Sequence, residues 1–231
     1  MSRCIITYAA DAHEELLDVA LPTYEEFARR HGYNLIVGKK MTDLLPAWNK
    51  IPLLLDAIDH YNEVVWFDCD LVVVNPSDDF PPLEKLHSLV RHFENSSEVP
   101  NSGVWRMRRA WGDLFMRDLL HEMMRLEVFR NHGWWEQAAL LTIMGYCVPP
   151  EGSHFPDTKC KCVYKTKWYD ACQFMRLKYN SHPNYRANKP MVVHCSYPNM
   201  AQRLEVMREL VKNPEFDYPK YDKPDEEETE E

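Results

Sequence analysis

Short apolar runs alternate with longer stretches of helical periodicity in the first part of the chain. Residues 3–8 and 34–37 are such runs, and between them apolar side chains recur at helical spacing, at Leu16, Leu17, Ala20, Tyr24 and Phe27. A strand, a helix and a second strand in this order favour a parallel sheet with flanking helices. The pattern therefore predicts an α/β fold with a mixed, mainly parallel sheet.

The first predicted helix, about residues 12–30, has recognisable ends. Asp11 can cap its beginning, and Gly32 suits its end because glycine readily adopts the left-handed conformation found there. Pro22 falls within the pattern, so the segment is either one helix or two helical pieces, because proline lacks the backbone donor that a helix interior uses.

The remaining elements follow from the same two periodicities. Helices are predicted at 51–61, 110–129, 134–144 and 200–212, and strands at 64–67, 71–74, 88–93, 101–107 and 191–195. In the helix at 110–129, the side chains expected to face inward are Trp111, Leu114, Phe115, Leu119, Met123, Leu126 and Phe129. Residues 94–100 are predicted to be a polar loop, and 149–190, with five prolines, a loop-rich region.

Two aspartates follow the strand predicted at 64–67. Asp68 and Asp70 separate two apolar runs, and carboxylates buried there without a partner would be unfavourable. At a strand end they would instead lie in the crevice where α/β sheets bind ligands, and alternate residues of an extended backbone share a face. The pair is therefore either a divalent-cation site or a turn with two solvated aspartates.

His194 ends a late apolar strand, where a third ligand can approach the same ion. The alternative is a histidine with a structural role only. Two carboxylates and one imidazole suit Mn²⁺ better than Mg²⁺, which prefers oxygen ligands alone. We therefore expect Mn²⁺, or else Mg²⁺, as the cofactor.

Two further polar groups are candidates for ligand binding. Asn101-Ser102-Gly103 is either a simple turn or a place where amide and backbone groups contact ligand hydroxyls, glycine allowing the approach. Glu136 and Gln137 begin a predicted helix, where they are ordinary partners of the helix dipole or hold a polar substrate. They follow two tryptophans, and a sugar calls for aromatic, amide and carboxylate side chains together.

The seven cysteines are odd in number and scattered, which favours reduced thiols over a disulfide framework. A zinc knuckle of Cys160, Cys162, Cys172 and His154 is the alternative to thiols in a loop-rich segment. Its spacing is not that of a common zinc finger.

Charge is concentrated towards the end of the chain. Residues 214–231 hold nine acids and two lysines, a balance of −7 that leaves −2 for residues 1–213 out of the formal net charge of −9. We therefore predict one folded domain, 1–213, and an acidic, disordered tail, 214–231. The body lacks a basic stripe with interleaved aromatics, so we expect no nucleic-acid partner.

No stretch approaches the roughly 20 apolar residues of a membrane span, and the N-terminus lacks the apolar core of a signal peptide. We therefore expect no membrane span and a cytoplasmic location.

Together the motifs resemble those of the GT-A nucleotide-sugar glycosyltransferases, and most closely the galactosyl/mannosyl/xylosyltransferase family with its short bacterial and phage relatives. In chain order they are Ile5-Ile-Thr-Tyr8, Trp48-x-Lys50, Val-Val-Trp-Phe-Asp-Cys-Asp, Asn-Ser-Gly-Val, Trp-Glu-Gln-Ala-Ala-Leu and Val-Val-His-Cys-Ser. The resemblance covers about residues 3–212, and through the short relatives it implies the cytoplasm of a bacterial or phage-infected cell. It implies a single-domain GT-A (Rossmann-like) fold and a metal-dependent hexosyltransferase that takes a nucleotide-sugar, by preference a UDP-hexose, and retains anomeric configuration.

The resemblance also implies residue roles. The nucleotide-sugar would be bound by Thr7, Tyr8, Asp11, Lys50, Asp68, Cys69, Asn101 and Ser102, and the metal by Asp68, Asp70 and His194. Glu136 and Gln137 would be catalytic, because carboxylate or amide oxygens near the anomeric carbon stabilise an oxocarbenium-like sugar. No motif falls in 149–190, where acceptor contacts are expected, so the acceptor stays open among a glycan, a lipid-linked sugar and a protein.

Two other functions compete with this interpretation. A phosphatase of the haloacid-dehalogenase type also places Asp-x-Asp after an apolar strand, but on its first strand and followed by Gly-Thr, whereas Leu71-Val72 follows the pair here. A non-catalytic sugar- or nucleotide-binding module is the second alternative, and a sugar-nucleotide transfer or hydrolysis assay separates it from an enzyme.

Overall fold

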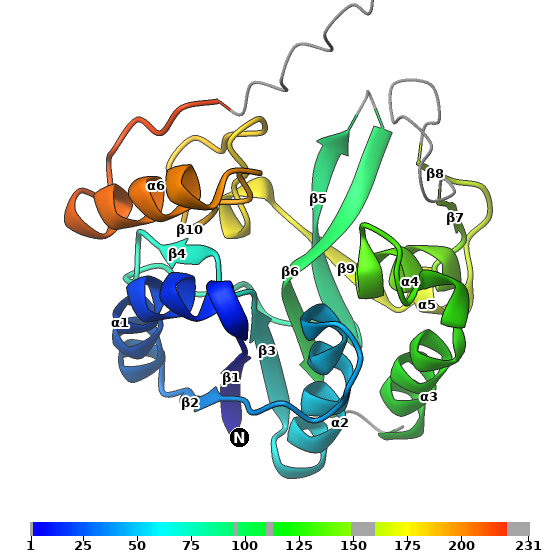
Figure 1. Cartoon of the computed structure of the whole chain (residues 1–231). Coiled ribbons are helices and arrows are strands. Elements are labelled where there is room, and N and C mark those ends of the chain that lie inside the picture. The colour runs from blue at the N-terminus through cyan, green and yellow to red at the C-terminus, as the bar shows by residue number, and fades with distance from the viewer. Residues whose placement is uncertain (1, 95–96, 110–112, 149–159, 221–231) are drawn as a thin grey trace, which may run out of the picture.

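The computed structural model of this chain describes residues 2–94, 97–109, 113–148 and 160–220. Its centre is a six-stranded sheet in the order β2-β1-β3-β6-β5-β9 (Figure 1). The strands are β1 (Arg3–Thr7), β2 (Asn34–Val37), β3 (Glu63–Phe67), β5 (His87–Glu94), β6 (Ser97–Arg108) and β9 (Cys172–Met175). Only β6 is antiparallel to its neighbours, which confirms the mixed, mainly parallel sheet.

Helices cover both faces of this sheet (Figure 1). One face carries α1 (Glu14–His31) and α6 (Met200–Lys212), and the other carries α2 (Lys50–His60), α3 (Asp113–Arg125) and α4 (Trp135–Ile143). The short elements are α5 (Lys167–Asp170), η1 (Asp11–His13), η2 (Pro46–Asn49), η3 (Glu127–Phe129) and η4 (Leu177–Tyr179). Two small antiparallel sheets join β4 (Leu71–Val73) to β10 (Val192–His194), and β7 (Tyr146–Cys147) to β8 (Lys161–Cys162).

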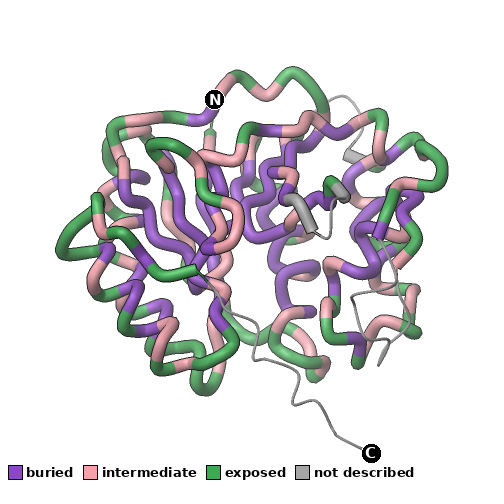
Figure 2. Tube along the Cα trace, turned by 90° about the horizontal axis from the view of Figure 1, so that it is seen from above, coloured by how far each residue is buried: buried purple, intermediate pink, exposed green. Residues whose placement is uncertain are grey.

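The two faces of the sheet explain the continuous apolar runs in its central strands. Ile5 and Val65 pack with α1 and α6, whereas their neighbours Ile6 and Trp66 pack with α2 and α4. A sheet covered on both sides buries both sets, so its strands read as continuous apolar runs. Figure 2 shows these buried strands enclosed by segments with exposed residues.

The first helix differs from its prediction at its beginning only. α1 runs without a break through Pro22, so of the two alternatives the segment is one helix. Asp11 does not cap it: the residue has φ +54°, lies in η1, and neither η1 nor α1 has a side-chain cap. Gly32 ends α1 in the left-handed conformation, as predicted (φ +69°).

Long-range pairing overrides the sequence pattern in the second half of the sheet. Residues 97–100, predicted to be in a loop, belong to β6, where they pair with β5. β9 is an edge strand inside the region predicted to be loop-rich. Residues 149–159 of that region and Trp111 lie outside the described residues.

The helix predicted at 110–129 is α3 followed by η3. Leu114, expected to face inward, is 73% exposed, because the face that packs is the one carrying Met116, Leu119, Leu120 and Met123. At the other end of the chain, residues 214–220 are not a detached tail. Tyr218 is buried in the α1–α6 core and its hydroxyl contacts Ser181, whereas 221–231 lie outside the described residues.

No disulfide joins any of the seven cysteines, all of which lie in the described ranges. Burial raises the pKa of the Cys4 and Cys172 thiols to about 12, so both are protonated and unreactive. Every helix within the described residues is too short or too polar to cross a bilayer.

Candidate active site

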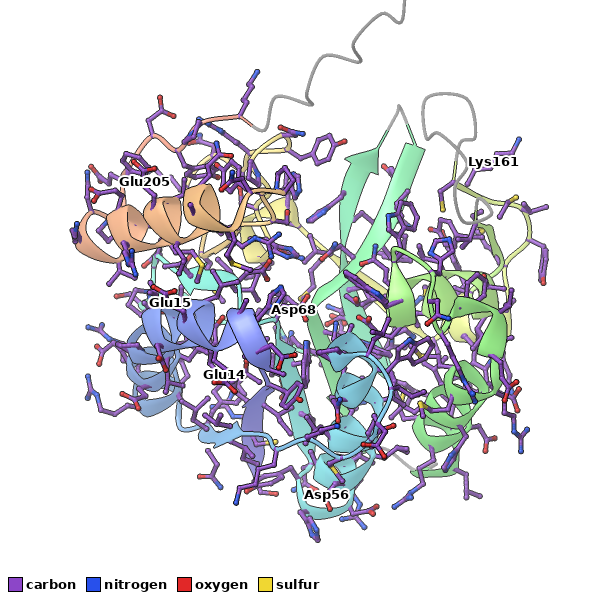
Figure 3. All side chains as sticks on the ribbon, in the orientation of Figure 1. Glu14, Glu15, Asp56, Asp68, Lys161 and Glu205 are labelled. Atoms are coloured by element: carbon purple, nitrogen blue, oxygen red, sulfur yellow. The ribbon has the colours of Figure 1, made fainter. Side chains whose placement is uncertain are left out.

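A cavity of about 300 Å³ lies where the carboxyl ends of β1 and β3 meet. Parallel strands of an α/β sheet bind ligands at this edge. Figure 3 shows Asp68 near the centre of the molecule, between α1 and the β5–β6 hairpin. The cavity is lined by Tyr8, Ala9, Ala10, His13, Leu45, Pro46, Ala47, Lys50, Trp66, Asp68, Cys69, Asp70, Trp135, Glu136 and Arg203.

The turn that carries the two aspartates is fixed by bonds that involve no ligand. The Tyr24 hydroxyl lies 2.7 Å from the carbonyl oxygen of Asp68 and 2.9 Å from that of Leu71, so it bridges the two ends of the turn. The backbone N–H of Asp68 donates to the carbonyl of Gly103. Trp66 Nε1 donates to Asp68 Oδ1 at 2.6 Å, which orients the carboxylate.

The β4–β10 ladder brings His194 to these aspartates. His194 pairs with Leu71, the first residue of β4, and the backbone N–H of Cys195 donates to the carbonyl of Asp70 at 2.9 Å. His194 Nε2 then lies 3.3 Å from Asp70 Oδ1. Potential ligand atoms of Asp68, Asp70 and His194 lie within 4.8 Å of one another. The structure thus assembles the three residues predicted as metal ligands.

Gly103 is required for this assembly. A Cβ at position 103 would lie 2.8 Å from His194 Cε1 and 2.9 Å from Asn101 Oδ1, closer than such atoms approach. The glycine therefore admits the imidazole of His194 against β6. The sequence indicated a close approach at this residue, but it is made by a side chain of the protein.

The three side chains fit a divalent cation. Two carboxylates and an imidazole are a donor set suited to Mn²⁺, and one ring nitrogen, His194 Nδ1, is buried without a hydrogen-bond partner in the described structure. Within the described residues no other group of three His, Cys, Asp or Glu side chains could hold an ion, so Cys160, Cys162 and Cys172 do not meet. His154, the fourth ligand of the zinc alternative, lies outside the described ranges.

Arg203 of α6 is a site residue that sequence analysis missed. Its Nη1 lies 3.1 Å from Asp70 Oδ2, and its Nε donates to the carbonyl of Tyr197. Burial by itself would raise the pKa of Asp70, but His194 and Arg203 outweigh burial and hold that pKa below its usual range. Asp70 is therefore ionised and ready to bind a cation.

A second polar network lies beside Asp68. Lys50, only 3% exposed, places its Nζ 2.6 Å from Glu136 Oε1 and 2.9 Å from Asp68 Oδ1. The Ser102 hydroxyl lies 3.1 Å from the same Glu136 oxygen. The Gln137 amide oxygen accepts from the backbone N–H of Ser102 at 3.1 Å.

The Lys50 ammonium thus pairs with two carboxylates, those of Asp68 and Glu136. Burial alone would lower the pKa of Lys50, but Asp68 and Glu136 outweigh it and raise that pKa, so the lysine stays charged. Burial raises the pKa of Glu136, against the opposing effect of Lys50. Glu136 is therefore protonated more readily than an ordinary glutamate.

A bulge in β6 positions this network. Leu89 pairs with Trp105 and the next residue, Val90, pairs with Asn101, so residues 102–104 bulge out of the pairing with β5. The expected turn at Asn101-Ser102-Gly103 is therefore a bulge within a strand. It turns Ser102 towards Lys50 and Glu136.

The candidate residues divide into two groups. Tyr8, Lys50, Asp68, Cys69, Asp70 and Glu136 line the cavity, whereas Thr7, Asp11, Asn101, Ser102, Gln137 and His194 do not. Ser102 and His194 contact residues of the first group, and Gln137 contacts Ser102. Asn101 Oδ1 accepts hydrogen bonds from Gly103 N–H and Asn180 Nδ2. Thr7 is buried at the end of β1, and Asp11 is an exposed residue of η1.

No protein-family model matches this chain, and no curated protein sequence matches it either. Its fold is similar to solved glycosyltransferases. One is involved in glycosylating the major capsid of the virus PBCV-1 (TM-score 0.63, 15% identity, over 90% of this chain and 99% of that one). Another is GlyE of Streptococcus pneumoniae TIGR4 (TM-score 0.56, 12% identity, over 96% and 67%).

A third is the galactosyltransferase LgtC, solved with donor and acceptor sugar analogs (TM-score 0.55, 12% identity, over 90% and 95%). At such identities the likeness concerns the fold. The fold is the α/β architecture of the GT-A glycosyltransferases, and the likeness does not single out the galactosyl/mannosyl/xylosyltransferase family.

Proposed function

We propose that this chain is a metal-dependent glycosyltransferase that moves a hexose from a nucleotide-sugar, with a UDP-hexose as the expected donor, to an acceptor hydroxyl. The observation that carries the proposal is that Asp68, Asp70, Lys50 and Glu136 line one cavity. His194 lies beside Asp70, and the fold is shared with glycosyltransferases. A phosphatase of the haloacid-dehalogenase type is less well supported, because the aspartate pair follows the third strand, β3.

The reaction joins the acceptor oxygen to the anomeric carbon and breaks the bond between that carbon and the donor phosphate oxygen. The electron pair of the broken bond and the hydroxyl proton leave with the nucleoside diphosphate. A divalent ion held by Asp68, Asp70 and His194 would supply Lewis-acid stabilisation of that leaving group. Arg203 adds a positive charge beside Asp70.

Glu136 is the proposed catalytic carboxylate, because it lines the cavity and is held towards Asp68 by Lys50. Its oxygen would stabilise positive charge that develops on the sugar ring. Gln137 accepts from Ser102, which in turn contacts Glu136, so we assign it a positioning role. Retention of anomeric configuration is proposed from the family resemblance.

Thermal unfolding with UDP, GDP, UDP-glucose and UDP-galactose, each with Mn²⁺ or EDTA, tests the proposal. A ligand at a hundred times its Kd adds about 2.7 kcal/mol, which raises the Tm of a chain of this size by about 5–10 °C. We expect such a shift with Mn²⁺ and a uridine nucleotide, and its loss in Asp70→Asn. The matched control is Asp56→Asn, since Asp56 is a largely exposed aspartate on α2 (Figure 3).

The outcomes separate the alternatives. No metal-dependent stabilisation by any nucleotide contradicts the transferase proposal. Stabilisation without release of UDP from a UDP-hexose, in the presence or absence of sugars, identifies a binding module instead.

A further inference from the structure

Trp135 is a large aromatic side chain exposed at the cavity. It lines the cavity and is 43% exposed, whereas the preceding Trp134 is partly buried and packs against the core on the α2–α4 face. Two consecutive tryptophans therefore have different roles. Trp134 anchors the turn before α4, and Trp135 presents its indole to solvent at the cavity mouth.

The exposed position of Trp135 is held by the backbone. Its φ is +43°, a conformation that a bulky residue rarely adopts unless the surrounding structure imposes it. The N–H of Trp135 donates to the carbonyl of His132 at 2.8 Å, and the N–H of Trp134 donates to His132 Nδ1. His132 is itself buried. The indole is therefore held in this position before any ligand binds.

An apolar segment accompanies Trp135 at the mouth. Leu45 is 44% exposed and lines the cavity with Pro46 and Ala47. These residues lie in or next to η2, which is joined to the segment before α4 by a hydrogen bond from Trp48 Nε1 to the carbonyl of Arg130. The two apolar walls are thus fixed relative to each other.

Burial divides the cavity into a charged floor and an apolar mouth. Lys50, Asp70 and Glu136 are each less than 8% exposed, whereas Trp135 and Leu45 are more than 40% exposed. A nucleoside diphosphate group would be drawn to the floor, where the metal ligands, Lys50 and Arg203 lie. The mouth carries no such charge. Glu136, the proposed catalytic carboxylate, follows Trp135 directly, so we expect the reacting carbon to lie between the charged floor and the apolar mouth.

We propose that Trp135, with Leu45 and Pro46, forms the acceptor subsite, and that the acceptor is a pyranoside whose apolar ring face stacks on the indole. This inference rests on the proposed function and names the substrate class of the same site. A pyranose has C–H groups on its ring faces and hydroxyls at its edge, so an exposed indole holds the ring while a hydroxyl points to the floor.

The test measures release of UDP from UDP-galactose and UDP-glucose with Mn²⁺. The probes are methyl glycosides of glucose, galactose and mannose, together with lactose and cellobiose, and water alone measures hydrolysis. We expect at least one sugar to accelerate release by the wild type. Trp135→Ala should lower the ratio of transfer to hydrolysis by about tenfold or more, as for the truncation of a buried aromatic anchor. Trp135→Phe should retain most of it.

Two further variants provide a control and an independent test. Tyr164→Ala removes an aromatic side chain that is 64% exposed and does not line the cavity, and it should leave both rates unchanged. Leu45→Ser changes the mouth without touching the turn before α4, and it should raise the KM for the sugar severalfold. It serves as the second measurement if Trp135→Ala does not fold, which its apo Tm shows.

Three outcomes would overturn the inference. A wild type that no sugar of the panel accelerates contradicts a pyranoside acceptor, and normal transfer by Trp135→Ala contradicts the indole as its binding surface. Parallel loss of transfer, hydrolysis and UDP affinity in Trp135→Ala would assign the indole to the donor base. Failure of the proposed function can be told apart from failure of this inference. In that case the wild type would show neither metal-dependent binding of UDP nor hydrolysis of the UDP-sugar in the reactions without added sugar.

Discussion

The two charged groups on the cavity floor are built in opposite ways. At Lys50 one ammonium lies between two carboxylates, those of Asp68 and Glu136. At Asp70 one carboxylate lies between an imidazole and a guanidinium, those of His194 and Arg203. Lys50 is enclosed, whereas the Arg203 side chain is 17% exposed.

This difference indicates which positive charge is a fixed part of the fold and which one a metal ion can replace. Removing Lys50 would leave two carboxylates without their shared cation, one of them fully enclosed. We expect a divalent ion beside Asp70 to compete with the Arg203 guanidinium for that carboxylate. We infer that the Lys50 group stabilises the fold of the floor and that the Asp70 group exchanges its cations.

The largest expected effect is on the Lys50 group. Lys50→Met should lower the free energy of unfolding by about 3–5 kcal/mol, because it leaves a buried charge unpaired. The double variant Lys50→Met/Glu136→Gln should recover part of this loss. Urea unfolding with EDTA present measures both.

Lys40→Met is the control for that series, since Lys40 is 61% exposed and pairs with an exposed Asp43. No resolvable change in the free energy of unfolding is expected there, as for surface substitutions generally. If Lys50→Met were as stable as the wild type, the division into permanent and exchangeable charges would be wrong.

A buried ionisable group that carries no charge sharpens the comparison. His87 Nε2 lies 3.0 Å from the carbonyl of Trp168, and Trp105 Nε1 donates to its Nδ1, so the ring is held in a neutral tautomer. Burial lowers the pKa of His87 to about 4. The unfolded chain, with a histidine pKa of about 6.5, therefore binds more protons between these two values.

Stability contributed by neutral His87 is thus present above about pH 6.5 and is lost as the pH falls towards 4. The slope for one proton is about 1.4 kcal/mol per pH unit, which gives about 3 kcal/mol over this interval. His87→Gln should reduce the pH dependence of unfolding by this amount, whatever its effect at neutral pH. His60→Gln, at a residue 67% exposed, should leave the slope unchanged, and an equal slope in both variants would refute the assignment.

The smallest expected effect is on the affinity for Mn²⁺ at Asp70. Arg203→Gln removes a cation that competes for Asp70, so Mn²⁺ alone should bind about fivefold more tightly, as for one partly exposed ion pair of about 1 kcal/mol. Calorimetry with Mn²⁺ measures the change. Arg208→Gln, on the same helix and paired with exposed Glu15, should show no such gain, and weaker Mn²⁺ binding by Arg203→Gln would reverse our view of this residue.

Local signals were sufficient for the first half of the sheet. β1, α1, β2, α2 and β3 follow from periodicity and end signals in consecutive segments, and Asp68 and Asp70 lie at a strand end, as expected. These elements are neighbours in space because the β-α-β connections join parallel neighbours. The sequence therefore contains most of what determines them.

Long-range contacts decide the rest. Residues 97–100 end a mostly polar segment, 94–100, in which local signals favour a loop, but the ladder with β5 makes them a strand. Arg203 belongs to a helix whose charged residues are typical of a solvated face, and its partner Asp70 lies 133 residues away. No local pattern distinguishes it from Arg208, so only the packing of α6 against β4 reveals it.

The β4–β10 ladder has a consequence for amino-acid substitution at the metal-binding residues. It brings positions 70 and 194 together through backbone hydrogen bonds and apolar packing, and none of these bonds uses the side chains of Asp70 or His194. Substituting those side chains should therefore leave their spacing intact. Selectivity for one ion over another can then evolve, or be redesigned, by single substitutions on an unchanged frame.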